Sequence, residues 1–222
     1  MRKTVFICIC VVFFGLSGCA ALPQKPIDDQ SAAIGISLQI DRLLSSMVGY
    51  LKPDTVLFVK LDEGSDSYLQ RNIIQSNYSK DKNIYLLNAA PGRYVAVAAI
   101  YGSGNHSVKS KEYITYFSHD LIKNTETAVS AGTMAFMGDY IIDMSIGLSN
   151  ADEAQLFYNK LTDPFSSSTL MPALRMMTGN FPFSRGALLE ANMDNKAKEE
   201  FINSTKINLK ESGWEAMIKE DK

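Results

Sequence analysis

The run from Tyr94 to Tyr101 restricts the fold of this chain more than any other stretch. It reads Tyr-Val-Ala-Val-Ala-Ala-Ile-Tyr and follows a Pro91-Gly92 pair, which is a common turn signal. Successive side chains of a strand point to opposite faces, so a strand made from this run would be apolar on both faces. Such a strand needs cover on both sides, and we therefore expect it at the centre of a β-rich domain.

Alternating apolar and polar residues predict further strands on either side of this run. Turn signals such as Lys52-Pro53-Asp54 separate the successive runs. Their spacing suits an antiparallel β-sandwich formed by residues 32–148. The predicted strands cover residues 34–40, 55–61, 72–78, 83–87, 94–101, 112–118 and 134–144, with a polar turn at 79–82.

The strand predicted at residues 134–144 alternates without interruption and is expected to be half-buried. Asp139 and Asp143 would share one face, which raises the hypothesis of a paired-carboxylate site for hydrolysis of envelope glycans. A polar edge that faces water explains the two acids more simply. One face would carry Met134, Phe136, Tyr140 and Ile142, and the other would carry Met137, Asp139, Ile141 and Asp143.

Beyond Leu148 the spacing of apolar residues changes to that of helices. A recurrence every four residues predicts a final helix over residues 194–210, and Ser212-Gly213 follows as a stop signal. The helices of residues 149–222 should pack on the sandwich, because an apolar face this narrow needs a surface to cover it. The predicted class is α+β, an antiparallel β-sandwich followed by C-terminal helices packed on it. The recurring residues are Ala197, Phe201, Thr205 and Leu209.

The first 18 residues have the pattern of a cleaved signal peptide. Arg2 and Lys3 give a positive start, residues 4–16 are almost entirely apolar, and small residues follow. A membrane-spanning helix needs about 20 apolar residues, so this run is too short to cross a bilayer. We therefore predict that residues 1–18 are removed on export.

Leu16-Ser17-Gly18-Cys19, at the end of this segment, resembles the lipobox of bacterial lipoprotein precursors. The resemblance implies cleavage between Gly18 and Cys19, a diacylglycerol on the sulfur of Cys19, and an acyl chain such as palmitate on its amine. Because Ala20 is not aspartate, the resemblance also implies the periplasmic side of the outer membrane if the source is Gram-negative. Residues 19–31 contain prolines and no periodicity, which predicts a flexible tether.

Composition and charge exclude several classes of protein. The 222 residues are 46% hydrophobic and 21% charged, as in ordinary globular proteins. Of the 22 basic residues Arg2 and Lys3 leave with the leader, so 20 remain against 24 acidic ones, a net charge of −4 without a basic block. A nucleic-acid partner is therefore disfavoured. The cysteines are Cys8, Cys10 and Cys19, so the mature body has no disulfide and must rely on its apolar core.

Two segments of the body are similar to strands of bacterial lipoproteins with transthyretin-like or carboxypeptidase-regulatory-like β-sandwiches. The first is the turn and strand Ala90-Pro-Gly-Arg-Tyr-Val95, and the second is the run from Ala131 to Tyr140. This similarity implies a β-sandwich and identifies no ligand.

Outside the leader the chain offers few groups for catalysis or metal binding. The two histidines, His106 and His119, are 13 residues apart, and no thiol remains apart from Cys19. Ser79 and Lys82 have the Ser-x-x-Lys spacing of penicillin-recognising enzymes but lie in a charged turn. The acidic loop 62–66 could hold calcium but lacks the order of an EF-hand. We predict no catalytic residue, no metal and no cofactor other than the covalent lipid on Cys19.

The expected function is that of a non-enzymatic, membrane-anchored lipoprotein of the cell envelope that binds or scaffolds another envelope component. A segment rich in methionine and phenylalanine, residues 176–183, could expose apolar surface to a protein partner. Two alternatives remain open: the carboxylate-dependent hydrolase, and a carrier of a small apolar ligand inside the sandwich. Tyr85, Tyr94, Tyr101, Tyr113, Tyr116 and Tyr140 could form a ligand platform, although core packing is their default role.

Lipid attachment predicts a specific labelling result. Cells that express the wild-type chain should incorporate radiolabelled palmitate into it, and the Cys19→Ala variant should incorporate none, because the variant lacks the sulfur that starts the modification. Labelling is read by fluorography of the immunoprecipitated chain. Equally little label in both proteins would contradict the lipid anchor.

Overall fold

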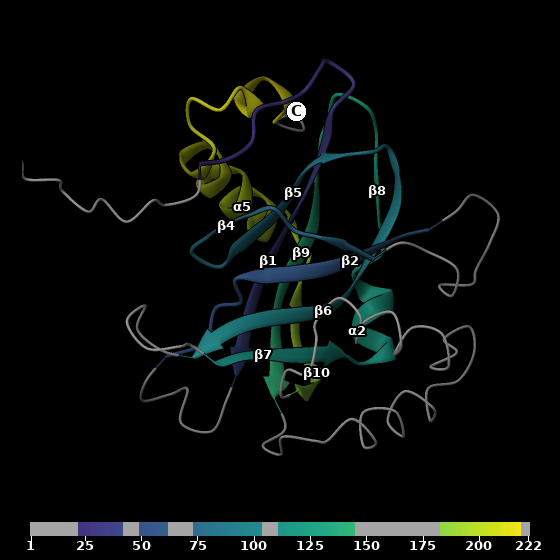
Figure 1. The fold of residues 1–222 in the computed structure, drawn as a ribbon, viewed down its shortest axis with the longest axis vertical. Coiled ribbons are helices and arrows are strands. Elements are labelled where there is room, and N and C mark those ends of the chain that lie inside the picture. The colour runs from purple at the N-terminus through teal and green to yellow at the C-terminus, as the bar shows by residue number, and fades with distance from the viewer. Residues whose placement is uncertain (1–21, 42–48, 62–72, 104–110, 145–182, 219–222) are drawn as a thin grey trace, which may run out of the picture.

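The computed structural model describes residues 22–41, 49–61, 73–103, 111–144 and 183–218 (Figure 1). Ten strands form one curled sheet in the order β3-β2-β6-β7-β10-β9-β1-β5-β4, with β8 paired to β6. The strands are β1 (Ala32–Asp41), β2 (Thr55–Leu61), β3 (Ile73–Gln75), β4 (Tyr78–Lys80), β5 (Asn83–Ala89), β6 (Gly92–Ser103), β7 (Lys111–Phe117), β8 (Thr127–Val129), β9 (Met134–Met144) and β10 (Phe183–Asn192). The helices are α2 (His119–Asn124), α5 (Asn195–Asn208) and the 3-10 turn η1 (Trp214–Met217).

The sheet is mixed, which corrects the expected antiparallel sandwich. β1 pairs with β9 in parallel and β7 pairs with β10 in parallel, while the other pairs are antiparallel. Side-chain alternation has the same period in both kinds of pairing, so it predicts strands without predicting their directions. A β-rich fold with a C-terminal helix is confirmed.

The central position predicted for Tyr94–Tyr101 is confirmed. These residues belong to β6, and every one of them is buried. β6 lies between β2 on one side and both β7 and β8 on the other. Since successive side chains point to opposite faces and all eight are buried, both faces of this part of β6 are covered, which accounts for its apolar character.

Thr125 completes the hydrogen bonding of β6 at the gap between β7 and β8. β8 pairs with Gly92–Tyr94 and β7 with Ala98–Ser103, so the segment between them lacks a strand partner on this side. The backbone N–H of Ala96 donates to Oγ1 of Thr125 at 2.9 Å, and that hydroxyl donates to the carbonyl of Ile122 at 2.7 Å. A side chain thereby replaces a strand, because a buried N–H must find an acceptor.

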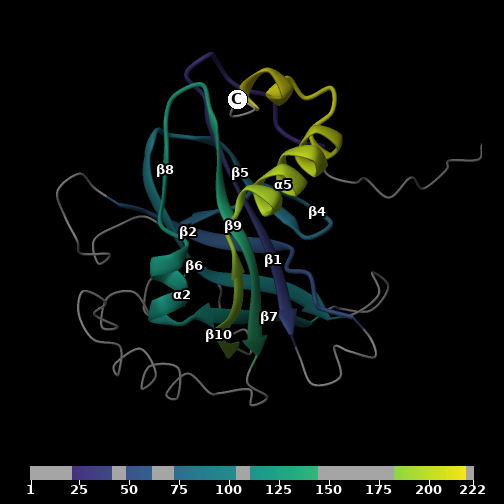
Figure 2. The ribbon, with the colours of Figure 1, turned by 180° about the vertical axis from the view of Figure 1, so that it is seen from behind.

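A second, smaller core lies between α5 and the outer face of β1, β5 and β9 (Figure 2). The ring of Phe201 stacks on Phe136 with centroids 4.6 Å apart and lies 5.9 Å from Tyr85. A Cβ on Gly35 would lie 2.2 Å from the Phe201 ring, so the glycine makes room for it. The helix predicted at 194–210 is confirmed as Asn195–Asn208, with Asp194 as its N-cap.

A β-bulge in β9 corrects the uninterrupted alternation expected at residues 134–144. The register with β1 shifts between Gly35 and Ser37, which face Phe136 and Asp139. Gly138 has a φ of +129°, a conformation that residues with a side chain rarely adopt. As a result Met137, Tyr140 and Ile142 all join the main core, whereas Met134 and Phe136 pack against the second core.

Four described elements, α2, β8, β10 and η1, had no counterpart among the predicted ones. α2 is only six residues long, and β8 only three, too short to produce a periodic pattern. β10 lies within residues 149–222, where helices were expected. Its side chains from Ala187 to Ala191 are half-buried or exposed, and its register shifts between Leu188 and Glu190, so it lacks the alternation of a half-buried strand. None of the described helices has the length and apolar content required to cross a membrane.

The bulge predicts a large cost for a side chain at Gly138. A Cβ there would lie 2.6 Å from the hydroxyl of Tyr140, which donates to the carbonyls of Met137 and Asn124. Gly138→Ala should therefore lower the free energy of unfolding in urea by about 2 kcal/mol or more.

Gly49→Ala is the matched control for this variant. Gly49 also has a positive φ, +81°, but a Cβ there would meet no atom within 4 Å. The control should lose about 1 kcal/mol from backbone strain alone. Equal losses in the two variants would show that the contact with Tyr140 contributes nothing.

Candidate functional site

The strands at the two ends of the sheet order, β3 and β4, are consecutive in the chain. β3 pairs with β2 and β4 pairs with β5, and only Ser76 and Asn77 stand between them. The chain therefore crosses from one end of the curled sheet to the other within two residues. Residues 72–78 were predicted as one strand, and the three successive polar residues Gln75, Ser76 and Asn77 inside it were the available signal of this interruption.

Side-chain hydrogen bonds make this crossing possible. The N–H of Ser76 donates to the carbonyl of Val56 at 2.9 Å, and the N–H of Val56 donates to Oγ of Ser76 at 3.0 Å. Oδ1 of Asn77 accepts from the N–H of Leu87 at 2.8 Å, and Nδ2 of Asn77 donates to the carbonyl of Leu87 at 2.9 Å. The Asn77 amide thus supplies the donor and acceptor that a neighbouring strand would supply.

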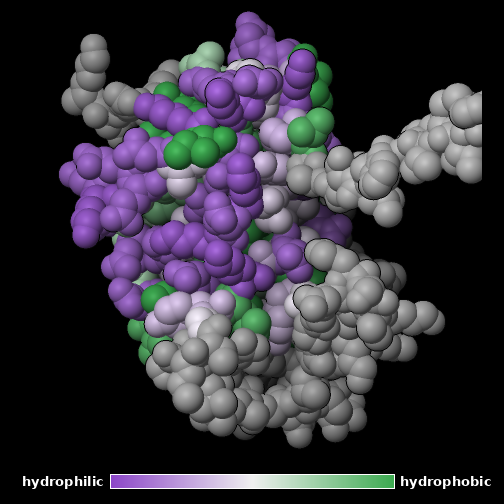
Figure 3. All heavy atoms as spheres, turned by 90° about the vertical axis from the view of Figure 1, so that its left-hand side faces the viewer, coloured by the Kyte–Doolittle hydropathy of each residue, from purple (hydrophilic) through white to green (hydrophobic). Residues whose placement is uncertain are grey.

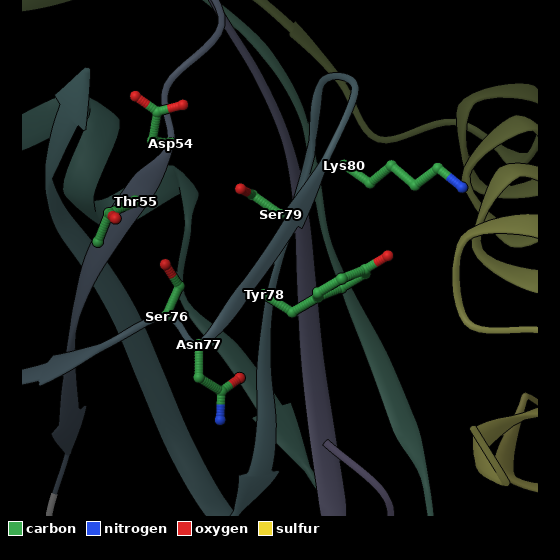
Figure 4. A pocket seen from close by; sticks show the side chains of 7 residues that line it. All are labelled: Asp54, Thr55, Ser76, Asn77, Tyr78, Ser79 and Lys80. Carbon is green, nitrogen blue, oxygen red and sulfur yellow. The ribbon is translucent and has the colours of Figure 1, made fainter. Parts of the chain in front are cut away.

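A cleft opens where β2 and β4 diverge from Ser76 (Figure 4). The hydroxyls of Ser76 and Ser79 point into the space between the two strands, whereas Tyr78 and Lys80 point to the opposite side, toward α5. The carboxylate of Asp54, at the rim, accepts from the N–H of Gly102 at 2.9 Å. The cavity volume is about 360 Å³, and the lining residues are Asp54, Thr55, Ser76, Asn77, Tyr78, Ser79 and Lys80.

The chemistry of this cleft is that of hydrogen bonding. The lining residues include neither histidine nor cysteine, so the arrangement of a nucleophile beside a base is not formed there. The hydroxyl of Tyr78 donates to the carbonyl of Asn208 at 3.0 Å, and burial together with the carboxylate of Asp81 raises its pKa. Tyr78 therefore stays protonated and fixes β4 against the end of α5.

The segment Gln24–Ile27 lies against the domain beside the cleft. We call the segment and the three side chains that hold it, those of Asn77, Asn88 and Trp214, the N-terminal clamp. Nε1 of Trp214 donates to the carbonyl of Gln24 at 2.6 Å, and Nδ2 of Asn77 donates to Oε1 of Gln24 at 3.2 Å. Nδ2 of Asn88 donates to the carbonyl of Lys25 at 3.0 Å, and Oδ1 of Asn88 accepts from the N–H of Ile27 at 3.1 Å.

Residues 19–31 were predicted to form a flexible tether. The clamp corrects this prediction for the part of the segment that begins at Gln24. From Gln24 onward the backbone is held by hydrogen bonds, and Ser31 accepts from the N–H groups of Ile27 and Asp28 in a closed turn. The partners of this segment are 53 to 190 residues away in the chain. No local pattern reveals contacts at such separations.

Several predicted site residues lie outside the described part of the chain. These include the lipid-attachment residue Cys19 and the cleavage residue Gly18, and also His106, the acidic loop 62–66 and residues 176–182. His119 is described and begins α2, where burial and then the charge of Lys123 lower its pKa. The described His, Cys, Asp and Glu residues form no group of three or more that could hold a metal ion.

The structure does not favour the paired-carboxylate hypothesis. Asp139 forms an ion pair with Lys82, whose Nζ lies 2.5 Å from Oδ2, and Asp143 is exposed on the same strand. Four residues along a strand correspond to about 13 Å, which exceeds the spacing that glycosidases use. Lys82 is also the lysine of the Ser-x-x-Lys pattern, and Ser79 lies on an edge strand rather than at the start of a helix.

The tyrosines proposed as a ligand platform lie in the core where the structure describes their side chains. Burial raises the pKa values of Tyr85, Tyr94 and Tyr140, and the hydroxyl of Tyr85 is held by Thr205 and Asn208. The cleft itself is open and rich in hydroxyl groups, unlike the enclosed apolar cavity that a carrier of apolar ligands would require. Tyr85, Tyr94, Tyr101, Tyr116 and Tyr140 are all buried.

Comparison of the chain with protein-family models, with curated proteins and with solved structures returned no match. The resemblances to lipoprotein precursors and to their β-sandwich domains therefore remain predictions from the residues quoted above.

Asn77 provides a test of the crossing that shapes the cleft. Asn77→Asp keeps the size of the side chain but removes both N–H donors and places a carboxylate beside the carbonyl of Leu87. We expect the free energy of unfolding to fall by about 2 to 4 kcal/mol at neutral pH. Asn88 is also half-buried, but its hydrogen bonds to Lys25 and Ile27 lie at the surface, so water can solvate the new charge and Asn88→Asp should lose less, about 1 kcal/mol.

The Asn77→Asp variant should also have a characteristic pH dependence. The charged carboxylate is disfavoured in the folded state, so the pKa of the carboxyl group introduced at position 77 should exceed its unfolded value of about 3.9. The native state then binds more protons than the unfolded state between the two pKa values. The stability deficit relative to wild type should therefore shrink as the pH falls through the folded pKa. A deficit that is independent of pH would contradict this account.

Proposed function

We propose that this chain is a lipid-anchored protein of a bacterial cell envelope that binds another envelope component without catalysing a reaction. The observation that carries the proposal is the N-terminal clamp. Only four residues lie between Cys19, the predicted site of the lipid, and Gln24, the first residue held by the clamp. A domain that is anchored through its mature N-terminus would need its N-terminal segment to be held against the rest of the domain, as the clamp holds it.

The anchor is strong enough to define where the domain works. Each buried methylene contributes about 0.8 kcal/mol, so a single acyl chain binds reversibly, whereas the diacylglycerol and N-acyl chain on Cys19 together hold the protein at the membrane. The periplasmic side of the outer membrane is the expected location if the source is Gram-negative. Confinement to a surface raises the local concentration of a partner on the same membrane, so modest intrinsic affinity suffices.

The cleft between β2 and β4 is the proposed contact site. Within the described residues β4 pairs with β5 alone, so its other edge borders the cleft. The alternation of hydrogen bonding along a strand directs the backbone groups of Ser79 toward this edge. An edge strand with free N–H and C=O groups can pair with an extended segment of another protein, and the hydroxyls of Ser76 and Ser79 add side-chain partners.

Photocrosslinking in cells tests this contact. A photoreactive phenylalanine analogue at Ser79, inside the cleft, should give one specific crosslinked product with an envelope component. The same analogue at Tyr50 is the control, because Tyr50 is an exposed aromatic residue outside the lining of the cleft. Products are detected by immunoblotting after irradiation, and the variants are compared by urea unfolding to confirm equal folding. Crosslinking at neither position, or the same product at both, would contradict the cleft as a binding site.

A further inference from the structure

Two large apolar side chains, one just before the clamp and one at its last residue, are unusually exposed. Leu22 is 87% exposed and Ile27 is 80% exposed, more than any other large apolar residue among those described. The backbone at Ile27 is nevertheless fixed, because its N–H donates to Asn88 and to Ser31. The two most exposed large apolar side chains among the described residues thus lie five positions apart in one short segment, whose backbone is held by hydrogen bonds from Gln24 onward.

The position of these residues limits what can cover them. Leu22 is three residues after Cys19 and Ile27 is eight residues after it. A chain extends by at most about 3.6 Å per residue, so Gln24 lies within about 18 Å of the predicted lipid. This distance is close to the radius of gyration of about 16 Å expected for a domain of this size. The clamped end of the domain therefore stays near the membrane surface.

On this basis we propose that the clamp orients the domain on the bilayer, with Leu22 and Ile27 in the membrane interface. This inference rests on the lipid anchor of the proposed function. Apolar contact rather than charge provides the attraction, because exposed Lys25 lies beside exposed Asp28 and Asp29. Binding should therefore depend little on anionic lipid.

The face of the domain that carries α5 and β4 agrees with this orientation. On the side of α5 and β4 the coloured surface is mainly hydrophilic, and its apolar residues form small, separate groups (Figure 3). The clamp lies near the start of β1 and beside η1, whereas Tyr50 lies at the other end of β1, where Leu51 pairs with Ile40 (Figure 1). Because Asn77 belongs to the clamp and lines the cleft, this orientation also holds the cleft near the membrane.

Depth-dependent fluorescence quenching tests the orientation. Leu22→Cys, Ile27→Cys and Tyr50→Cys are made in the full lipidated chain, which has no other thiol after acylation of Cys19. Each is labelled with an environment-sensitive maleimide and reconstituted into vesicles of phosphatidylcholine, with or without phosphatidylglycerol, that carry quencher-labelled lipids. We expect a loss of emission at positions 22 and 27, no loss at position 50, and the same result in both lipid mixtures.

The controls separate failure of the orientation from failure of the anchor. If the unsubstituted chain reacts with the maleimide, or does not float with the vesicles, Cys19 is not acylated and the anchor itself fails. If the chain floats but positions 22 and 27 keep their emission, or position 50 loses as much, the anchor stands and the proposed orientation is wrong. Shielding of position 27 only after addition of an envelope extract would assign the apolar residues to a protein partner and overturn contact with the bilayer.

Discussion

The side-chain amide of Asn77 is the interaction on which the architecture most depends. A curled sheet must satisfy the backbone groups of its last strands, and here the chain itself passes between them at Ser76 and Asn77. Asn77 supplies a donor and an acceptor to Leu87, in a place where an unpaired buried backbone group would cost about 1 to 3 kcal/mol. The same amide also donates to Oε1 of Gln24. Asn77 therefore contributes to the closure of the sheet, to the lining of the cleft and to the clamp.

The parts of the fold that could be predicted are those in which burial leaves a local pattern. β6 is apolar at all eight positions from Tyr94 to Tyr101, because both faces of this part of the strand are covered. α5 shows its buried face as Ala197, Phe201 and Thr205, spaced by about one helical turn. In both elements buried positions recur at a regular interval along the chain. That interval distinguishes a strand from a helix in the sequence.

The parts that could not be predicted depend on contacts between distant segments. The direction of β9 relative to β1 changes no side-chain period, and Thr125 replaces a strand through a single hydroxyl. Gly138 is different, because a glycine inside an apolar strand is a recognised sign of a bulge and was available in the sequence. The cleft had only the polar run from Gln75 to Asn77 as a sign, and the clamp had none, since its partners come from three separate elements.

The bond between Trp214 and Gln24 joins positions 190 residues apart. Because the chain is made from its N-terminus, Gln24 is synthesised long before Trp214, and this hydrogen bond cannot form until residue 214 has been added. A chain that ends before residue 214 would therefore lack one of the hydrogen bonds that hold Gln24–Ile27 against the domain, and under the proposed lipid anchor its orientation would be less well defined. The Trp214 indole thus makes the conformation of the N-terminal segment conditional on synthesis through residue 214.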